Sequence, residues 1–221
     1  MNTQILCSVL ILLLSSCHCF IPCCATQTWD SCPADCEIDS IDPNIDRCCD
    51  IGQMCIGSQC VTKDDGSAKI DALAALESAT DCAYYDKLDE DTQCGKWGYP
   101  QYIGKTKCIT YKDYESLYAH QEWLDAVRKC LQVTMTEFLR NNFKEKGTST
   151  CDEIMDSGVE AHYGCFLKPD ADRPELTICN SMSDVVMLGL NGFTRVHKLY
   201  KVLLRVFKEC AFNESTGAVQ L

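Results

Sequence analysis

The sequence lacks the residue patterns on which most enzymes depend. It contains four histidines, and three of them, His120, His162 and His197, lie outside the N-terminal region. Each of the three stands alone, without a serine or cysteine nucleophile motif beside it. The sequence therefore predicts a protein that is not an enzyme and has no catalytic residues and no cofactor.

Positive charge is also scarce. The chain has 20 Lys and Arg residues against 32 Asp and Glu residues, which gives a net charge of −12. A chain this acidic repels the phosphate backbone, so we expect no nucleic-acid partner.

No apolar run is long enough to cross a bilayer. Residues 5–14 are almost all apolar, but a membrane-spanning helix needs about 20 such residues. Small residues follow at once, including Cys17 and Cys19, and this pattern predicts a signal peptide over residues 1–19. Residues 14–17 also resemble a bacterial lipoprotein box, an interpretation that the high cysteine content disfavours.

Cysteine, in contrast, is abundant. The chain has 19 cysteines, which indicates an oxidising compartment and a secreted protein. Removal of residues 1–19 deletes three cysteines and leaves sixteen, an even number that can all form disulfides. Zinc binding is not expected, because a secreted chain would oxidise these thiols first. The predicted half-cystines are Cys23, Cys24, Cys32, Cys36, Cys48, Cys49, Cys55, Cys60, Cys82, Cys94, Cys108, Cys130, Cys151, Cys165, Cys179 and Cys210.

Residues 21–61 hold eight of these cysteines, with prolines and glycines between them, so this segment is predicted to be a small disulfide knot. Its ending, CCDIGQMCIGSQC, resembles cystine-knot toxins and whey-acidic-protein modules. In the whey-acidic pattern another cysteine stands where this sequence has Asp42. The resemblance implies a protease-inhibitor or toxin role as an alternative function.

Residues 62–67 are polar and turn-forming, and they are predicted to be a linker. Eight cysteines lie before the linker and eight after it, so each part can close its own disulfides. The prediction is thus mainly α, a disulfide-stapled helical domain at residues 68–212 preceded by the cysteine-rich knot, with a C-terminal tail at 213–221.

Hydrophobic periodicity predicts the helices of the second part. The strongest pattern lies over residues 121–140, where Trp123, Val127, Leu131, Met135 and Phe138 recur at steps of four or three and Cys130 lies beside them. Further helices are predicted over residues 68–80, 151–165, 183–190 and 193–210, with Asn180 as an alternative start of the short helix that ends at Leu190. The second of these starts at a capping box of Thr150 and Glu153. Residues 81–111 are predicted to be a loop whose aromatic residues Trp97, Tyr99 and Tyr102 cover the helices.

The last predicted helix carries basic residues along one side. Arg195, Lys198, Lys201, Arg205 and Lys208 recur at steps of three or four. This stripe is interpreted first as the solvent-facing side of a packed helix, with sulfated glycans or an anionic membrane surface as the alternative ligands. Asn213 begins an N-glycosylation motif that is predicted to lie just past the helix.

Acidic residues cluster at two places, Asp39, Asp42 and Asp46 in the knot and Asp86, Asp89, Glu90 and Asp91 before Cys94. Neither cluster has the glycine-punctuated loop of an EF-hand. A solvated acidic surface is predicted, with calcium association only weak and diffuse.

The cysteine order from Cys108 to Cys179 in helical context, with the closing segment NGFTRVHKLYKVLLRVFKEC, resembles the stanniocalcins over about residues 80–212. This resemblance implies a secreted, disulfide-linked helical glycoprotein hormone associated with calcium and phosphate handling. The leading functional prediction is a secreted protein that acts by binding, as a stanniocalcin-like ligand or as an acidic, calcium-associated matrix component. Its predicted partner is an extracellular protein, receptor or matrix, or a second copy in a homodimer.

Overall fold

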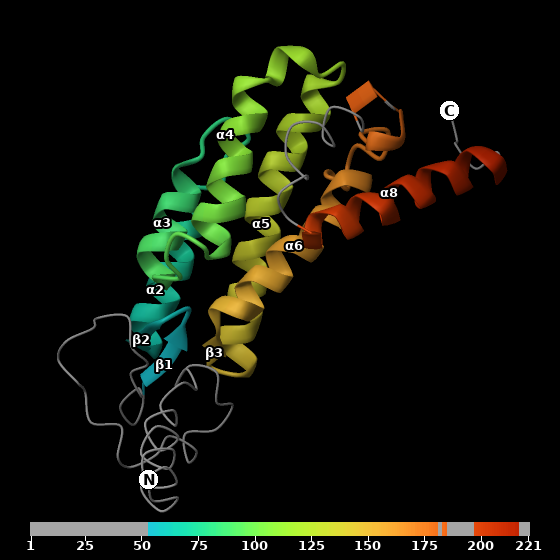
Figure 1. Ribbon diagram of the computed structural model, residues 1–221. Coiled ribbons are helices and arrows are strands. Elements are labelled where there is room, and N and C mark those ends of the chain that lie inside the picture. The colour runs from blue at the N-terminus through green and yellow to red at the C-terminus, as the bar shows by residue number, and fades with distance from the viewer. Residues whose placement is uncertain (1–52, 181–182, 185–196, 217–221) are drawn as a thin grey trace, which may run out of the picture.

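The computed structural model describes residues 53–180, 183–184 and 197–216, and this part of the chain is mainly helical (Figure 1). The prediction of a mainly α, disulfide-bonded fold is confirmed for it. The predicted signal peptide, Cys23 to Cys49 and the acidic cluster Asp39, Asp42 and Asp46 lie outside the described residues. The α-helices are α2 (Lys63–Ala74), α3 (Ala83–Thr92), α4 (Thr106–Asp113), α5 (Gln121–Glu145), α6 (Cys151–Leu167) and α8 (His197–Thr216).

The long helix α5 is the centre of the fold, and Figure 1 shows it alongside the other helices of the bundle. It starts at Gln121, where the sequence predicted, and continues one turn further, to Glu145. Trp123, Val127 and Met135 on its predicted apolar stripe are fully buried. The helix is held by the packing of this stripe on α6 and α2, because an isolated helix of this composition would be only marginally stable.

Helix α6 begins at the predicted capping box. The Thr150 side chain accepts a hydrogen bond from the Glu153 amide, and the Glu153 carboxylate accepts one from the Thr150 amide. Both bonds satisfy amides that the first turn leaves without helical partners. This explains why α6 starts sharply at Cys151.

A small sheet closes one end of the helical body, in the order β2-β1-β3. Strands β1 (Gln53–Ile56) and β2 (Gln59–Thr62) form an antiparallel hairpin, and β3 (Thr148–Ser149) pairs parallel to β1. Gly57 turns the hairpin at φ +61°, a conformation that favours glycine. The buried side chains of Ile56 and Val61 join the helical core, so this hairpin packs directly on the helices.

The predicted linker at 62–67 is instead the start of α2. Thr62 is the N-cap, and its hydroxyl accepts a hydrogen bond from the Asp65 amide. The negative charges of Asp64 and Asp65 in the first turn interact favourably with the positive end of the helix dipole. Gly66 lies against the Phe143 ring, where an added Cβ would come within 2.1 Å of a ring carbon. These polar and small residues therefore serve a helix start, and α2 ends at Ala74, which leaves Leu76 at the surface.

The predicted loop at 81–111 also contains helices. It forms α3, a π-helical segment η3 (Pro100–Lys105) and α4. Tyr84, Tyr85 and Leu88 of α3 are buried in the core. Their burial stabilises a helix whose other residues are mostly acidic or polar. Short 3₁₀ turns, η4 (Glu115–Leu117) and η5 (Ile178–Asn180), complete the connections.

The eight cysteines after residue 67 pair with one another. The bonds are Cys82–Cys108, Cys94–Cys151, Cys130–Cys165 and Cys179–Cys210. Cys130–Cys165 joins α5 to α6, as expected for a cysteine beside the apolar stripe of α5. Cys55 and Cys60 are disulfide-bonded as well.

Helix α8 packs against α6 and runs at a wide angle to the long axis of the bundle (Figure 1). Leu199, Val202, Leu203 and Cys210 are buried, whereas Tyr200 is 53% exposed. The helix runs to Thr216, so Asn213 lies within it rather than past its end.

Candidate binding surface

The most exposed large aromatic side chain in the described part of the chain is Trp97. It is 66% exposed and lies between α3 and η3. The indole ring lies 5.3 Å from the Tyr102 ring, edge to face, and the Lys96 ammonium group lies 5.3 Å from the indole centroid. We call Lys96, Trp97 and Tyr102 together the Trp97 surface.

The chain on either side of Trp97 is fixed in place. Helix α3 ends at Thr92 and is capped by Gln93, whose backbone is left-handed and whose amide donates to the Asp89 carbonyl. Gly95 continues the turn at φ +72°, and the Gly98 amide donates to the Gly95 carbonyl. Cys94, in the same turn, is bonded to Cys151 at the start of α6.

Tyr99 anchors the other side of the turn. Its side chain is fully buried and packs against Gly158 of α6, where an added Cβ would come within 2.2 Å of the ring. A disulfide and a buried aromatic ring thus hold a short turn that exposes an indole ring. The prediction that the aromatics of this segment cover the helices is confirmed for Tyr99 and wrong for Trp97.

An exposed tryptophan on a fixed base has a specific physical consequence. Its apolar surface is in contact with water in the free protein, and its two side-chain torsions lose little entropy on binding. Tryptophan is enriched among the residues that dominate protein–protein binding energies. The Trp97 surface therefore has the composition of a binding anchor.

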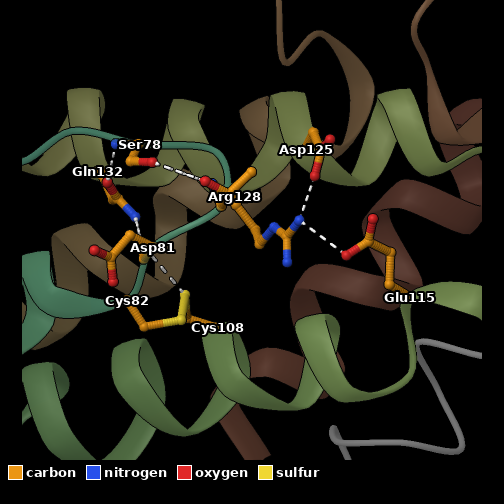
Figure 2. Close-up of polar contacts among 9 residues, drawn as sticks. Ser78, Asp81, Cys82, Cys108, Glu115, Asp125, Arg128 and Gln132 are labelled. Carbon is orange, nitrogen blue, oxygen red and sulfur yellow. Dashed lines mark hydrogen bonds and ion pairs between the residues drawn. A yellow bond between two sulfur atoms is a disulfide. The ribbon is translucent and has the colours of Figure 1, made fainter.

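The polar residues of α5 are structural. Gln132 is fully buried; its Oε1 accepts from the Ser78 amide at 2.7 Å and its Nε2 donates to the Asp81 carbonyl at 3.2 Å (Figure 2). Arg128 is also buried and forms ion pairs with Asp125 and Glu115. These contacts tie the segments before α3 and after α4 to α5.

The three histidines in the described part of the chain belong to different elements. The imidazole Nδ1 of His120 lies 3.1 Å from the carboxylate of Asp184, a buried residue that also accepts from the Ala119 and His120 amides. His162 is buried on α6, and its Nδ1 lies 2.7 Å from the Gly158 carbonyl. His197 starts α8.

His162 makes stability depend on pH. Burial lowers its pKa to about 4, an effect that the Gly158 hydrogen bond opposes and the charge of Lys107 reinforces. The unfolded histidine has a pKa of about 6.5. Between these pH values the unfolded chain binds a proton that the folded protein does not, so the free energy of unfolding falls as the pH falls.

We expect this loss to reach about 3 kcal/mol between pH 7 and pH 4. Denaturant unfolding of the wild type and of His162→Phe at both pH values measures it, because phenylalanine keeps an aromatic ring and does not titrate. His120→Gln is the control, since His120 is half-exposed. If His162→Phe loses as much stability at low pH as the wild type does, the assignment to His162 is wrong.

Three of the four residues in the acidic cluster near α3, Asp86, Glu90 and Asp91, are paired with lysines. Asp91 is fully buried, and its carboxylate bonds the ammonium groups of Lys69 at 2.8 Å and Lys87 at 2.9 Å. Asp86 pairs with Lys105, and Glu90 with Lys87. The interpretation as a solvated surface is therefore wrong for Asp91. In the described part of the chain, no group of three or more His, Cys, Asp or Glu residues is placed to hold a metal ion.

A cavity of about 510 Å³ lies beside this cluster, with Lys69, Lys87 and Thr62 in its wall. The two lysines could attract an anion, but both already bond Asp91. The cavity is therefore a weaker candidate than the Trp97 surface.

The residues of the predicted basic stripe on α8 have different surroundings. Arg205 pairs with Glu160 of α6 at 2.7 Å and stacks 4.1 Å from the Tyr163 ring centroid. Lys201 and Lys208 are exposed. Arg195 lies outside the described residues, and Lys198 belongs to α8. Part of the stripe thus binds the neighbouring helix, which reduces the charge available to a glycan or membrane.

No match to the chain was found among protein families, curated proteins or solved structures. Among the helices searched in the described residues, none is long and apolar enough to cross a membrane. The disulfides are consistent with an extracellular protein.

The exposure of Trp97 was not predicted, because Trp97, Tyr99 and Tyr102 were all expected to cover the helices. The available signal was the spacing CGKWGY, in which glycines stand two residues before and one residue after the tryptophan. Such flanking glycines indicate a turn, and a turn places its central side chain at the surface.

Proposed function

We propose that the protein is secreted and acts without catalysis, by binding another extracellular protein through the Trp97 surface. The exposure of Trp97 on a base held by Cys94–Cys151 and the buried Tyr99 carries this proposal. A rigid base lowers the entropy lost on binding, and the indole ring supplies apolar area that a partner can cover.

Several features support binding over the other roles that the sequence left open. A calcium-associated matrix role would use free carboxylates, whereas Asp86, Glu90 and Asp91 are paired with lysines. A toxin or protease-inhibitor role would use the N-terminal knot; most of that knot lies outside the described residues, so this role stays a prediction. A stanniocalcin-like ligand for a receptor agrees best with the proposal, and a homodimer stays a prediction.

Binding to cells of the producing organism tests the proposal. Labelled full-length wild type should bind saturably to an extracellular site, and Trp97→Ala should raise the Kd at least about tenfold, because loss of an anchor residue costs more than about 1.4 kcal/mol.

Leu117→Ala is the matched control. Leu117 is a large apolar residue, 56% exposed, on η4 outside the Trp97 surface. Its variant should bind like the wild type. An unchanged Kd for Trp97→Ala, or no saturable binding of the wild type, would contradict the proposal.

A further inference from the structure

The Cys94–Cys151 disulfide differs in its accessibility from the other three disulfides that join the cysteines after residue 67. In each of these three pairs one cysteine residue is buried in the core: Cys108 (4% exposed), Cys165 (2%) and Cys210 (3%). Cys94 and Cys151 are both only half-buried. Attack on a disulfide requires an external thiolate to reach a sulfur atom, so access favours this bond over the others.

The two sulfurs of this bond have different surroundings. Cys151 is the first residue of α6, where free amides stabilise negative charge. The Ser58 hydroxyl lies 3.5 Å from the Cys151 sulfur and must be the donor, because a half-cystine carries no proton. Asp152 and Glu153 oppose the effect of the amides. The access of an external thiolate therefore favours attack on this bond, and the Ser58 contact indicates that the Cys151 sulfur is the one that leaves.

Ser58 is held in position by the hairpin turn between β1 and β2. Its amide donates to the Thr92 carbonyl at 2.7 Å, and the Gly57 amide donates to the Ser149 carbonyl at 2.6 Å. The hairpin tip therefore bridges the residues just before Cys94 and Cys151. These backbone contacts direct the Ser58 hydroxyl at the Cys151 sulfur, and they do not depend on the disulfide.

We propose that Cys94–Cys151 is a thiol-exchange site for an external dithiol. A thiolate of the dithiol attacks the Cys94 sulfur and forms a mixed disulfide, while the bond between Cys94 and Cys151 breaks and its electron pair leaves as the Cys151 thiolate. The second thiol of the dithiol then attacks the mixed disulfide and releases Cys94. The dithiol supplies both electrons and becomes a disulfide, and the two protein cysteines are reduced.

Exchange at this bond changes one part of the molecule. It disconnects the turn that carries Trp97 from α6, while Cys82–Cys108 still joins the start of α3 to α4. The inference concerns the same turn as the proposed function but does not depend on binding, since the chemistry needs only the two sulfurs and their access.

Partial reduction of the full-length protein tests the site. The oxidised protein is treated with limiting dithiothreitol, quenched with iodoacetamide and digested, and the labelling of each cysteine is followed with time. Cys94 and Cys151 should be labelled together and at least about tenfold faster than Cys108, Cys165 and Cys210. Equal or slower labelling of Cys94 and Cys151 would overturn the proposal.

Two further measurements test the direction of attack. Reduced glutathione followed by acid quenching should leave its adduct on Cys94; an adduct mainly on Cys151 would overturn the assigned leaving group. Ser58→Ala should slow the reduction of this bond by about twofold, whereas Ser116→Ala, at an exposed serine on η4, should not. Equal rates for Ser58→Ala and the wild type would show that Ser58 does not assist the leaving sulfur. None of these outcomes depends on a binding partner, so they are independent of the proposed function.

Discussion

Trp123→Ala is expected to lower the free energy of unfolding by about 3–5 kcal/mol. The Trp123 side chain is 1% exposed on the core face of α5, and its indole N–H donates to the Phe166 carbonyl at 3.0 Å. The substitution removes the largest fully buried side chain and leaves a cavity at the contact between α5 and α6. It also leaves a buried carbonyl without this donor. Denaturant unfolding of the oxidised protein measures the change.

Trp97→Ala is the matched control for this prediction, because it removes the same side chain from an exposed position. Its free energy of unfolding should change by less than about 0.5 kcal/mol. Trp123→Phe, which keeps a ring but removes the donor, should fall between the two. If Trp97→Ala and Trp123→Ala lower the free energy of unfolding by similar amounts, the assignment of Trp97 to an exposed position is wrong.

Removal of the Cys130–Cys165 bond, by Cys130→Ala with Cys165→Ala, is expected to cost about 4 kcal/mol. The bond spans 35 residues, and the chain-entropy model gives a loss of this size because the unfolded chain becomes freer. The bond joins α5 to α6, two of the helices that form the core. Unfolding in denaturant, followed by circular dichroism, measures the loss.

The Cys94→Ala and Cys151→Ala double variant is the comparison. That bond spans 57 residues, so the model predicts a similar loss, also about 4 kcal/mol. A loss below about 1 kcal/mol for the Cys130 and Cys165 variant would mean that packing alone holds α5 to α6.

The sequence predicted those elements whose signals are local and strong. The start of α5 followed from the apolar period that begins at Trp123, and the start of α6 from the capping box of Thr150 and Glu153. Each signal depends on side chains within one or two turns of the same helix. Contacts with distant parts of the chain therefore did not change the structure that these local signals predict.

The sequence failed where distant contacts decide the structure. Residues 63–67 are polar, but Thr62 caps them as a helix, and the Phe143 ring on α5 packs against Gly66. Helix α3 has few apolar residues, yet Tyr84 and Tyr85 are buried: the Tyr84 hydroxyl bonds Thr136 of α5, and the Tyr85 ring lies against Gly104 of η3. These contact residues on α5 and η3 lie outside the helices that they stabilise, so no local sequence pattern predicts the contacts.

The candidate binding surface was harder to predict for the same reason. Tyr99 is buried because Gly158, on α6, leaves room for its ring, and the nearby Trp97 has no such partner in the core. Composition and spacing treat both aromatics as core residues. The difference between them is set by a glycine about sixty residues away in the chain.

Disulfide mapping of the unreduced protein tests the account most directly, because the bundle and the base of the Trp97 surface both depend on the pairing. Digestion with trypsin and Glu-C places the eight cysteines from Cys82 to Cys210 on separate peptides, since Glu160 separates Cys151 from Cys165. Mass spectrometry should find the linked pairs Cys82–Cys108, Cys94–Cys151, Cys130–Cys165 and Cys179–Cys210. A bond from any of these eight to a cysteine before residue 61, or a different pairing among them, would contradict the account.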